Sequence, residues 1–137
     1  MRPARKAHLK LGRRGEDAAR RLLESKGCEI LARNWRIRAG ELDLVARDGG
    51  AILFVEVKTR RRIGRYRPLD NLGYRQKRRN FQAAKFYWKM IGSPKLLLRF
   101  DLIEVVMTRW RLLEIRHWRD YRPPFGSGSG GGCDDEV

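Results

Sequence analysis

Cysteine and histidine are scarce in this chain of 137 residues, and acidic residues are few beside the basic ones. Its two cysteines, Cys28 and Cys133, provide no disulfide framework, and together with two histidines they show no metal-binding Cys/His spacing. The longest uninterrupted apolar run extends only from Ala51 to Val55, which is too short to cross a bilayer. The basic N-terminus lacks the apolar h-region of a secretory signal. These absences lead us to expect a cytoplasmic protein in a reducing setting.

Positive charge is what the chain has in excess. There are 32 Lys and Arg residues against 16 Asp and Glu, which gives a net charge of +16. A small domain does not need this charge for solubility, so it indicates a polyanionic partner such as nucleic acid or an anionic membrane surface. A membrane-surface protein would present an amphipathic basic helix, but Phe81, Ala84 and Trp88 are better placed to pack on a sheet. We therefore expect nucleic acid, DNA rather than RNA, and no membrane.

Hydrophobic periodicity predicts two helices and five strands. The first helix carries Leu11, Gly15, Ala18 and Leu22 on one face and should end at Gly27. The second helix is expected over 74–91, and the strands over 28–35, 41–47, 51–58, 96–106 and 110–117. The order is α-β-β-β-α-β-β, which predicts an α/β or α+β fold, a mixed sheet of about five strands flanked by helices.

Composition divides the chain into three segments. Residues 1–11 are expected to form a basic N-terminal arm. Residues 12–125 contain all of the predicted elements and form one domain, which suits the length and the hydrophobic fraction of 42%. Residues 126–137 are Gly/Ser-rich and end in acids, so we expect a flexible tail.

A hairpin in the middle of the chain gathers the chemically interesting residues. The Gly-Gly pair after Asp48 accepts a tight turn, so Asp48 should pair with Ala51. In that register Asp43 lies opposite Glu56 and Glu41 lies opposite Lys58. Side chains at i and i+2 share a face, so these four polar groups come together. The opposite face would be apolar and carry Leu42, Leu44, Val55 and Val57.

Two opposed carboxylates repel each other unless a positive group separates them, because their Cβ atoms lie only about 4.5–5.5 Å apart. Either Lys58 or a divalent cation between Asp43 and Glu56 would relieve this repulsion, and Mg²⁺ commonly takes one or two protein carboxylates. A bound metal would activate a water and neutralise charge on a phosphate, and Lys58 could orient that water or stabilise the transition state. A solvated face of a half-exposed hairpin explains the same spacing equally well.

Further charged residues accompany the hairpin. Glu16 lies at the margin of the apolar stripe of the first helix, where an acid near the N-terminus is also favourable for the helix alone. Basic residues follow the strand that ends at Lys58 and open the second helix, and we expect them to bind phosphates, although a generic solvated loop has similar composition. Tyr66 and Tyr74 lie among them and could stack on bases. The predicted nucleic-acid-binding residues are Arg60, Arg61, Arg62, Arg65, Arg67, Lys77 and Arg78.

Five stretches, in this order, resemble the YraN-type family of bacterial predicted endonucleases. They are GEDAA (15–19), NW (34–35), GELDLV (40–45), FVEVKTR (54–60) and RFDLI (99–103). The resemblance covers about residues 12–117. It implies a restriction-endonuclease-like fold, similar to archaeal Holliday-junction resolvases, and makes residues 12–125 a nuclease-like domain. It also implies a PD-(D/E)XK site that uses Mg²⁺ or Mn²⁺.

The same resemblance implies roles for individual residues. Asp43 corresponds to the first metal-binding carboxylate, and Glu56 and Lys58 correspond to the E-x-K pair. Glu16 corresponds to the acid of the first helix, and Glu41 to the Glu of the G-E-x-D segment. All five are therefore candidate catalytic residues, with Asp43 and Glu56 as the metal ligands.

Two other positions qualify the resemblance. Asp101 corresponds to the R-F-D segment and is expected to have a structural or supporting role. The family often has Lys-Gln at the start of the second helix, where this chain has Gln76-Lys77, so the role of that lysine does not carry over directly.

The sequence thus predicts a metal-dependent endonuclease-like protein that binds and hydrolyses DNA, with branched or single-stranded DNA as candidate substrates. A resolvase-like enzyme would act as a symmetric homodimer. The alternative is a non-catalytic DNA- or RNA-binding protein with a vestigial site. A two-histidine ribonuclease built on His8 and His117 has little support, and we interpret His117 as a packing residue of a strand.

Overall fold

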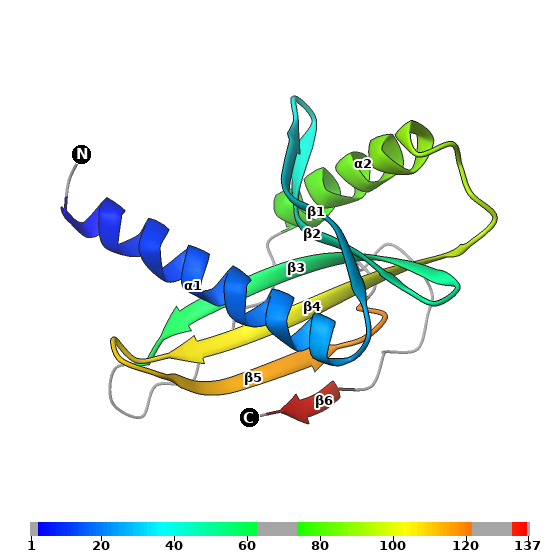
Figure 1. Ribbon diagram of the computed structural model, residues 1–137. Coiled ribbons are helices and arrows are strands. Elements are labelled where there is room, and N and C mark those ends of the chain that lie inside the picture. Colours follow the sequence, from blue (N-terminus) through cyan, green and yellow to red (C-terminus); the bar gives the residue numbers. More distant parts are fainter. Residues whose placement is uncertain (1–2, 63–73, 122–132, 137) are drawn as a thin grey trace.

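The computed structural model describes residues 3–62, 74–121 and 133–136. They form a two-helix, six-stranded α+β fold (Figure 1). The elements are α1 (Pro3–Ser25), β1 (Glu29–Ile37), β2 (Gly40–Asp48), β3 (Ala51–Arg61), α2 (Tyr74–Met90), β4 (Leu97–Met107), β5 (Leu112–Trp118) and β6 (Cys133–Glu136). The predicted order α-β-β-β-α-β-β is confirmed for the first seven of these elements. None of the described helices combines the length and the apolar character needed to cross a membrane.

The strands lie in one mixed sheet in the order β1-β2-β3-β4-β5-β6. The central pair, β3 and β4, is parallel, and every other neighbouring pair is antiparallel. The helix α2 provides the crossover between the two parallel strands, as such a connection requires. The mixed sheet flanked by helices is therefore as predicted.

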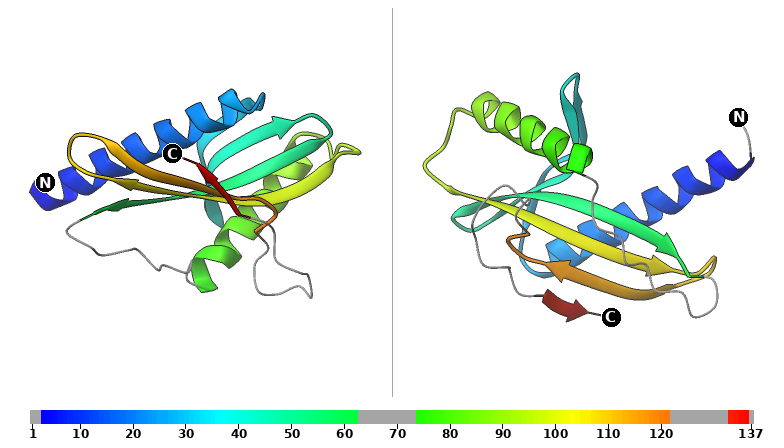
Figure 2. Two further views of the ribbon diagram at one scale, coloured as in Figure 1. Left: turned by 90° about the horizontal axis from the view of Figure 1, so that it is seen from below. Right: turned by 180° about the vertical axis from the view of Figure 1, so that it is seen from behind.

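The two helices cover opposite faces of the sheet (Figure 2). Alternate residues of β3 point to different cores: Leu53 and Val55 pack on the α1 side, whereas Ile52 and Phe54 pack on the α2 side. Both sets are buried. β3 thus has two apolar faces over its first five residues, and it becomes polar on the α2 side only from Glu56 onward.

The helix α1 is longer than expected. Ala19 and Leu23 are fully buried, with Leu22 packed beside them, so the predicted stripe is present. The helix ends at Ser25, and Gly27, the predicted stop, follows two residues later with a positive φ of 86°. The expected N-terminal arm over 1–11 is wrong from Pro3 onward, because those residues continue α1. Alanine, lysine, arginine and leucine dominate this segment, and all have high helix propensity. The prediction of an arm considered only the positive charge of the segment.

The acidic tail is also more ordered than expected. Residues Cys133–Glu136 form β6, antiparallel to β5, whereas the sequence predicted a flexible segment over 126–137. The register places Asp135 opposite Arg116 and Asp134 opposite His117. This pairing depends on the edge of β5 as a partner, which a composition-based prediction does not consider. The remaining tail residues lie outside the described part of the chain.

One apolar face of the central hairpin differs from the prediction. Leu44 and Val55 belong to the α1-side core, but Leu42 packs with Val45 on the α2 side. The end of the β1–β2 hairpin bends away from the rest of the sheet and lies beside α2 (Figure 1). This bend between Leu42 and Leu44 brings Leu42 to α2. The sequence prediction assumed a regular flat strand, in which Leu42 and Leu44 would share one face.

A buried ionic network lies on the α1 side of β4. Asp101 and His117 are 2% and 1% exposed, and the Asp101 carboxylate lies 2.7 Å from His117 Nε2. Arg99 donates two hydrogen bonds of 2.9 Å to the same carboxylate. Burial raises the pKa of Asp101, but the hydrogen bonds from His117 and Arg99 outweigh it, so the pKa is lowered. His117 lies in a strand and is buried, as predicted, but it contacts Asp101 and Lys26 through its ring nitrogens and is therefore part of a polar network, not only a packing residue.

Candidate active site

The β2–β3 ladder ends where the charged residues begin. The register runs from Asp48 opposite Ala51 to Leu44 opposite Val55, as predicted, and then stops. Instead of a ladder pair, the Asp43 carboxylate accepts a hydrogen bond of 2.9 Å from the backbone N–H of Val57. The predicted direct pairs Asp43–Glu56 and Glu41–Lys58 are therefore not formed by the backbone. The bend that moves Leu42 to the α2 side ends this register.

Asp43 and Glu56 nevertheless meet through their side chains, which share a hydrogen bond. Burial, followed by the charge of Asp43, raises the pKa of Glu56 to about 9. Burial also raises the pKa of Asp43 to about 6, with further contributions from the charges of Glu16 and Glu41. In the metal-free protein a proton is therefore held between the two carboxyl groups near neutral pH. Both carboxyl groups are half-buried and accept hydrogen bonds from Val57 and Asn80, so they differ from the fully solvated face of a surface hairpin.

Lys58 follows Glu56 by two residues on the same face of β3 and is partly buried. Burial lowers the pKa of Lys58, the charge of Arg60 lowers it further, and the nearby carboxylates of Glu56 and Asp43 oppose that shift. The lysine thus faces the carboxyl pair in a setting that weakens its own hydration. Such an ammonium group interacts more strongly with an added anion than one in bulk water does.

Asn80 completes the site and was missed by the sequence analysis. It lies in α2, is 9% exposed, and donates a hydrogen bond of 2.8 Å from Nδ2 to Glu56 Oε2. The predicted stripe of α2 began one residue later, at Phe81, which is in fact 39% exposed. The buried residues that share the face of Asn80 are Ala83, Ala84 and Tyr87. The sequence did contain a signal for this role, because Asn80 is a polar residue at helical spacing from the apolar residues of the buried face of α2.

A close approach between Gly40 and α2 positions Asn80. A Cβ atom on Gly40, the first residue of β2, would collide with the backbone carbonyl of Arg79, the residue before Asn80. Only glycine therefore allows β2 and α2 to approach this closely. The glycine of the GELDLV stretch thus has a packing role that connects the strand bearing Asp43 to the helix bearing Asn80.

Substituting Gly40→Ala should lower the free energy of unfolding by about 1–3 kcal/mol, because the backbone of α2 must shift to remove the collision. The same shift should weaken the Asn80–Glu56 hydrogen bond. Chemical denaturation measures the effect, and Gly50→Ala is the matched control because its Cβ would meet nothing within 4 Å. Equal destabilisation by the two substitutions would contradict this packing role.

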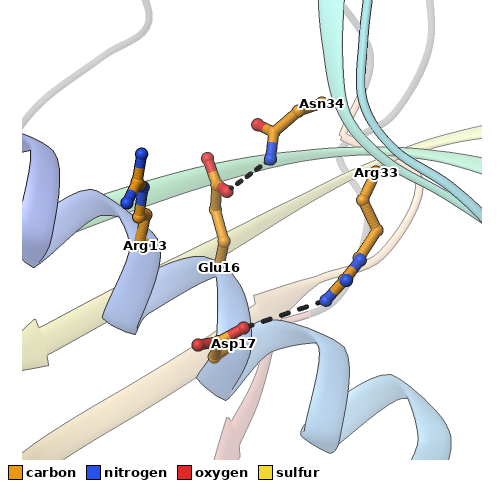
Figure 3. A pocket seen from close by; sticks show the side chains of 5 residues that line it. All are labelled: Arg13, Glu16, Asp17, Arg33 and Asn34. Carbon is orange, nitrogen blue, oxygen red and sulfur yellow. Dashed lines mark hydrogen bonds and ion pairs between the residues drawn. The ribbon is translucent and has the colours of Figure 1, made fainter.

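Glu16 lies in a polar pocket of about 330 Å³ between α1 and β1 (Figure 3). Its Oε2 accepts a hydrogen bond of 3.1 Å from Asn34 Nδ2, and the neighbouring Arg33 and Asp17 are 4.0 Å apart. Asn34 has a positive φ of 50°, which asparagine tolerates better than most residues. The charge of Glu16 contributes to the raised pKa of Asp43, so the first-helix acid belongs to the same electrostatic environment.

Glu41 is less directly involved. It is opposite Arg36 in the β1–β2 register, and the two side chains form an ion pair of 3.3 Å. Its charge also helps to raise the pKa of Asp43. Within the described ranges 3–62, 74–121 and 133–136, no group of three or more His, Cys, Asp or Glu side chains is arranged to hold a metal ion. Asp43 and Glu56 are thus the carboxylates available as a pair.

The predicted phosphate-binding residues are only partly described. Arg60 to Arg62 lie at the end of β3, where Arg61 pairs with Met107 and the Arg62 N–H donates to the Met107 carbonyl at 2.9 Å. Arg61 and Arg62 are exposed. Lys77 and Arg78 lie in the first part of α2. Arg65 and Arg67, with Tyr66, fall outside the described residues.

Comparison with known proteins identifies the family. The model of the family described as "Uncharacterised protein family UPF0102" matches residues 15–105, a range that contains Glu16, Glu41, Asp43, Glu56 and Lys58. The chain belongs to the UPF0102 family. The predicted membership in the YraN-type family is thereby confirmed.

Relatives from several bacteria carry the same UPF0102 name. A UPF0102 protein of Nocardia farcinica is 44% identical over 98 residues, which cover 72% of this chain and 77% of the relative. One from Rhodococcus jostii is 39% identical over 113 residues, covering 82% and 96%. One from Chlorobaculum parvum is 38% identical over 111 residues, covering 81% and 84%. The similarity extends over most of the fold described above.

Proposed function

We propose that this UPF0102 protein is a metal-dependent endonuclease of the PD-(D/E)XK type that hydrolyses phosphodiester bonds of DNA. The observation that carries the proposal is the pair of half-buried carboxyl groups, Asp43 and Glu56, in contact with each other beside the half-buried Lys58, with the pKa of both acids raised. A structural role alone does not favour two half-buried acids in contact, because their repulsion and partial desolvation destabilise the fold. The mixed sheet and the order of its elements are those expected for a restriction-endonuclease-like fold.

The donor chemistry of this pair fits Mg²⁺ or Mn²⁺. Asp43 and Glu56 would hold the cation, since hard divalent ions prefer carboxylate oxygens and often take only one or two from the protein. A cation would replace the shared proton and remove the repulsion that raises both pKa values. When bound, such a metal supplies an activated water and neutralises charge on the phosphate.

The protein's own side chains have distinct roles in this proposal. Lys58 would donate a hydrogen bond to a phosphate oxygen, a role suited to its weakened hydration. Asn80 fixes the orientation of Glu56 through Oε2 and leaves Oε1 to face the carboxylate of Asp43 or a cation. Glu16 and Glu41 increase the negative potential around Asp43 and so favour a bound cation.

The substrate class follows from the charge distribution. A net charge of +16 and the exposed Arg61 and Arg62 favour a ligand with many phosphates. The predicted binding residues show no pattern for reading base edges, so recognition of DNA shape, as in branched or single-stranded DNA, is the form we propose. Cutting two strands of a branched substrate would require a homodimer. We also propose that the protein acts in the cytoplasm.

Cleavage of a labelled panel tests the proposal. The panel contains single-stranded, duplex, flap and four-way-junction DNA together with RNA, each incubated with Mg²⁺, Mn²⁺ or EDTA. We expect metal-dependent cleavage of at least one DNA substrate and none in EDTA. Cleavage of RNA alone would overturn the choice of DNA, and binding without cleavage of any substrate would overturn the catalytic role.

Replacing both Arg61 and Arg62 with alanine should weaken DNA binding and reduce the salt dependence of the association constant. Each lost phosphate contact lowers the slope of log K against log[salt] by about 0.9 for duplex DNA, so we expect a decrease of nearly 2. Fluorescence anisotropy at several salt concentrations measures it. Arg47→Ala with Lys95→Ala removes the same charge at the other end of β3, and an equal decrease there would show that only net charge matters.

One observation favours a second candidate function, a non-catalytic DNA- or RNA-binding protein with a vestigial site. The described residues contain no cluster of three or more metal-ligating side chains, so any cation would depend on two carboxylates and water. Such a protein would bind the same substrates and cleave none of them. The cleavage panel therefore separates the two candidates.

A further inference from the structure

The turn between β4 and β5 presents an exposed tryptophan. Trp110 is 82% exposed, the highest value among the exposed large hydrophobic side chains of the described residues. A tryptophan is usually buried to a large extent, because its ring carries a large apolar area. The neighbouring Arg109 guanidinium lies over this ring, 4.9 Å from its centroid. The turn therefore combines an open aromatic surface with positive charge.

Hydrogen bonds hold this turn in a defined shape. Thr108 Oγ1 accepts hydrogen bonds from the backbone N–H groups of Trp110 at 3.3 Å and Arg111 at 3.1 Å. The Thr108 N–H in turn donates to the Arg111 carbonyl at 2.8 Å. Arg14 of α1 donates from Nη1 to the Arg109 carbonyl at 3.0 Å and so joins the turn to the helix. Trp110 is thus displayed on a fixed support, which lowers the entropy lost on binding.

A groove of about 550 Å³ runs between this turn and α1. Its walls include the apolar Leu22, Met107 and Ile115, together with the cationic Arg14, Arg21 and Arg111. Asp17 is an acid that also borders the groove, and it lies 4.0 Å from Arg33 on its other side. An apolar floor with a cationic rim suits a ligand that has flat apolar faces and negative charge.

Met107, which lines the groove, pairs with the arginine-bearing end of β3. Arg61 and Met107 are register partners, and the Arg62 N–H donates to the Met107 carbonyl, one residue before the turn begins. Figure 1 shows the end of β3, the β4–β5 turn and the N-terminal half of α1 together at one end of the sheet. Lys58 lies roughly 10 Å back along β3 from Arg61. The groove faces the α1 side of the sheet and Lys58 faces the α2 side, so a strand held at the turn would reach the carboxyl pair by passing around this end of the sheet.

We infer that the β4–β5 turn binds single-stranded nucleic acid by stacking an unpaired base on Trp110, while Arg14, Arg109 and Arg111 hold neighbouring phosphates. The inference takes its ligand class from the proposed function but does not require cleavage. Stacking on an exposed aromatic ring needs a free base face, which a single strand offers and an intact duplex does not. The same positive groups would favour the phosphates of that strand.

Binding of fluorescent oligothymidylate in EDTA tests this inference. Trp110→Ala should weaken binding by about 5- to 150-fold, the range for loss of one base–aromatic stack. An abasic oligonucleotide of the same length keeps the phosphates and lacks the bases, so its affinity should not change. Phe86→Ala is the matched control, because Phe86 is an aromatic residue 61% exposed on α2, and it should bind oligothymidylate as the wild type does.

Each other outcome has a definite meaning. Equal weakening of abasic and oligothymidylate binding, or an equal loss in Phe86→Ala, would overturn base stacking at the turn. Unchanged binding by Trp110→Ala would also overturn the inference, because the tryptophan would then not contact the bound strand. A protein that binds through Trp110 but cleaves no substrate would retain this inference and lose the proposed nuclease function.

Discussion

Replacing Glu56 with glutamine is expected to lower the rate of metal-dependent cleavage by at least about 1,000-fold, because a metal ion contributes several kcal/mol and each 1.36 kcal/mol is a factor of ten. The substitution changes charge without changing size. The new amide oxygen can still accept from Asn80, and its nitrogen can donate to Asp43, so both hydrogen bonds of the native side chain have counterparts. Loss of activity would then report loss of a carboxylate and not of the fold.

Lys58→Met extends this prediction to the third member of the site. It keeps the aliphatic stem but removes the ammonium group, and we expect a decrease of about 10²–10³ in the cleavage rate, as for removal of one positioned donor. Both variants should retain most of the affinity for substrate DNA, because Lys58 supplies one phosphate contact and the arginines proposed to bind the other phosphates are unchanged. The control is Glu29→Gln, which removes an exposed carboxylate of β1.

Two outcomes would contradict the assignment. If binding and cleavage decline together in both variants, these residues hold the ligand or the fold and not the reaction. If Glu29→Gln loses activity to the same extent, the effect is one of overall charge.

Glu56→Gln is also expected to raise the melting temperature of the metal-free protein, and more so as pH rises. The pKa values of Asp43 and Glu56 in the folded protein, about 6 and about 9, lie above their ordinary values of 3.8 and 4.5. The folded protein therefore holds protons more tightly than the unfolded chain does. The stability from this pair is complete below about pH 4 and is lost as pH rises through about 6 and then about 9.

The substitution imitates the protonated side chain at every pH and so removes most of this loss. A gain of 1 kcal/mol shifts the melting temperature by roughly 2–8 °C for domains of this size range, so we expect a difference of several degrees at alkaline pH and little near pH 4. Thermal melts in EDTA measure the difference between variant and wild type. The lowered pKa of Asp101 makes the stability of both proteins fall with decreasing pH, and this shared contribution cancels in the difference.

Added Mg²⁺ should reverse the order of the two proteins. A cation that binds the folded wild type raises its melting temperature by mass action, and it should have little effect on Glu56→Gln, which lacks one ligand. Equal stabilisation of both proteins by Mg²⁺ would contradict a cation site that includes Glu56. A melting-temperature difference that does not depend on pH would contradict a proton shared between Asp43 and Glu56.

The local pattern of the sequence was sufficient for much of this fold. The hairpin register from Asp48 to Leu44 follows from turn chemistry, and the end of α1 follows from Gly27. It also identified Asp43, Glu56 and Lys58 as neighbours, although it gave the wrong reason for their proximity. They meet through side chains at a bend, whereas the sequence suggested a continuous backbone ladder.

What the sequence did not reveal depends on contacts between distant segments. Asn80 reaches Glu56 only because Gly40 allows α2 to approach β2, and neither residue is close to Glu56 in the chain. The strand β6 requires the edge of β5 as a partner, which composition alone does not show. Trp110 was predicted to lie in a strand because it is apolar, but the structure places it in a turn with its side chain exposed to solvent. In each case the local sequence allows several roles for the residue, and tertiary contacts decide between them.

The most direct measurement is single-turnover cleavage of the preferred DNA substrate by the wild type and by Asp43→Ala, each with Mg²⁺ and with EDTA. The account predicts cleavage by the wild type with Mg²⁺ only, and none by Asp43→Ala under either condition, while both proteins bind the substrate. Cleavage by Asp43→Ala at the wild-type rate would contradict the account, because the reaction would then not depend on the carboxyl pair. Cleavage by the wild type in EDTA would contradict the role of the metal.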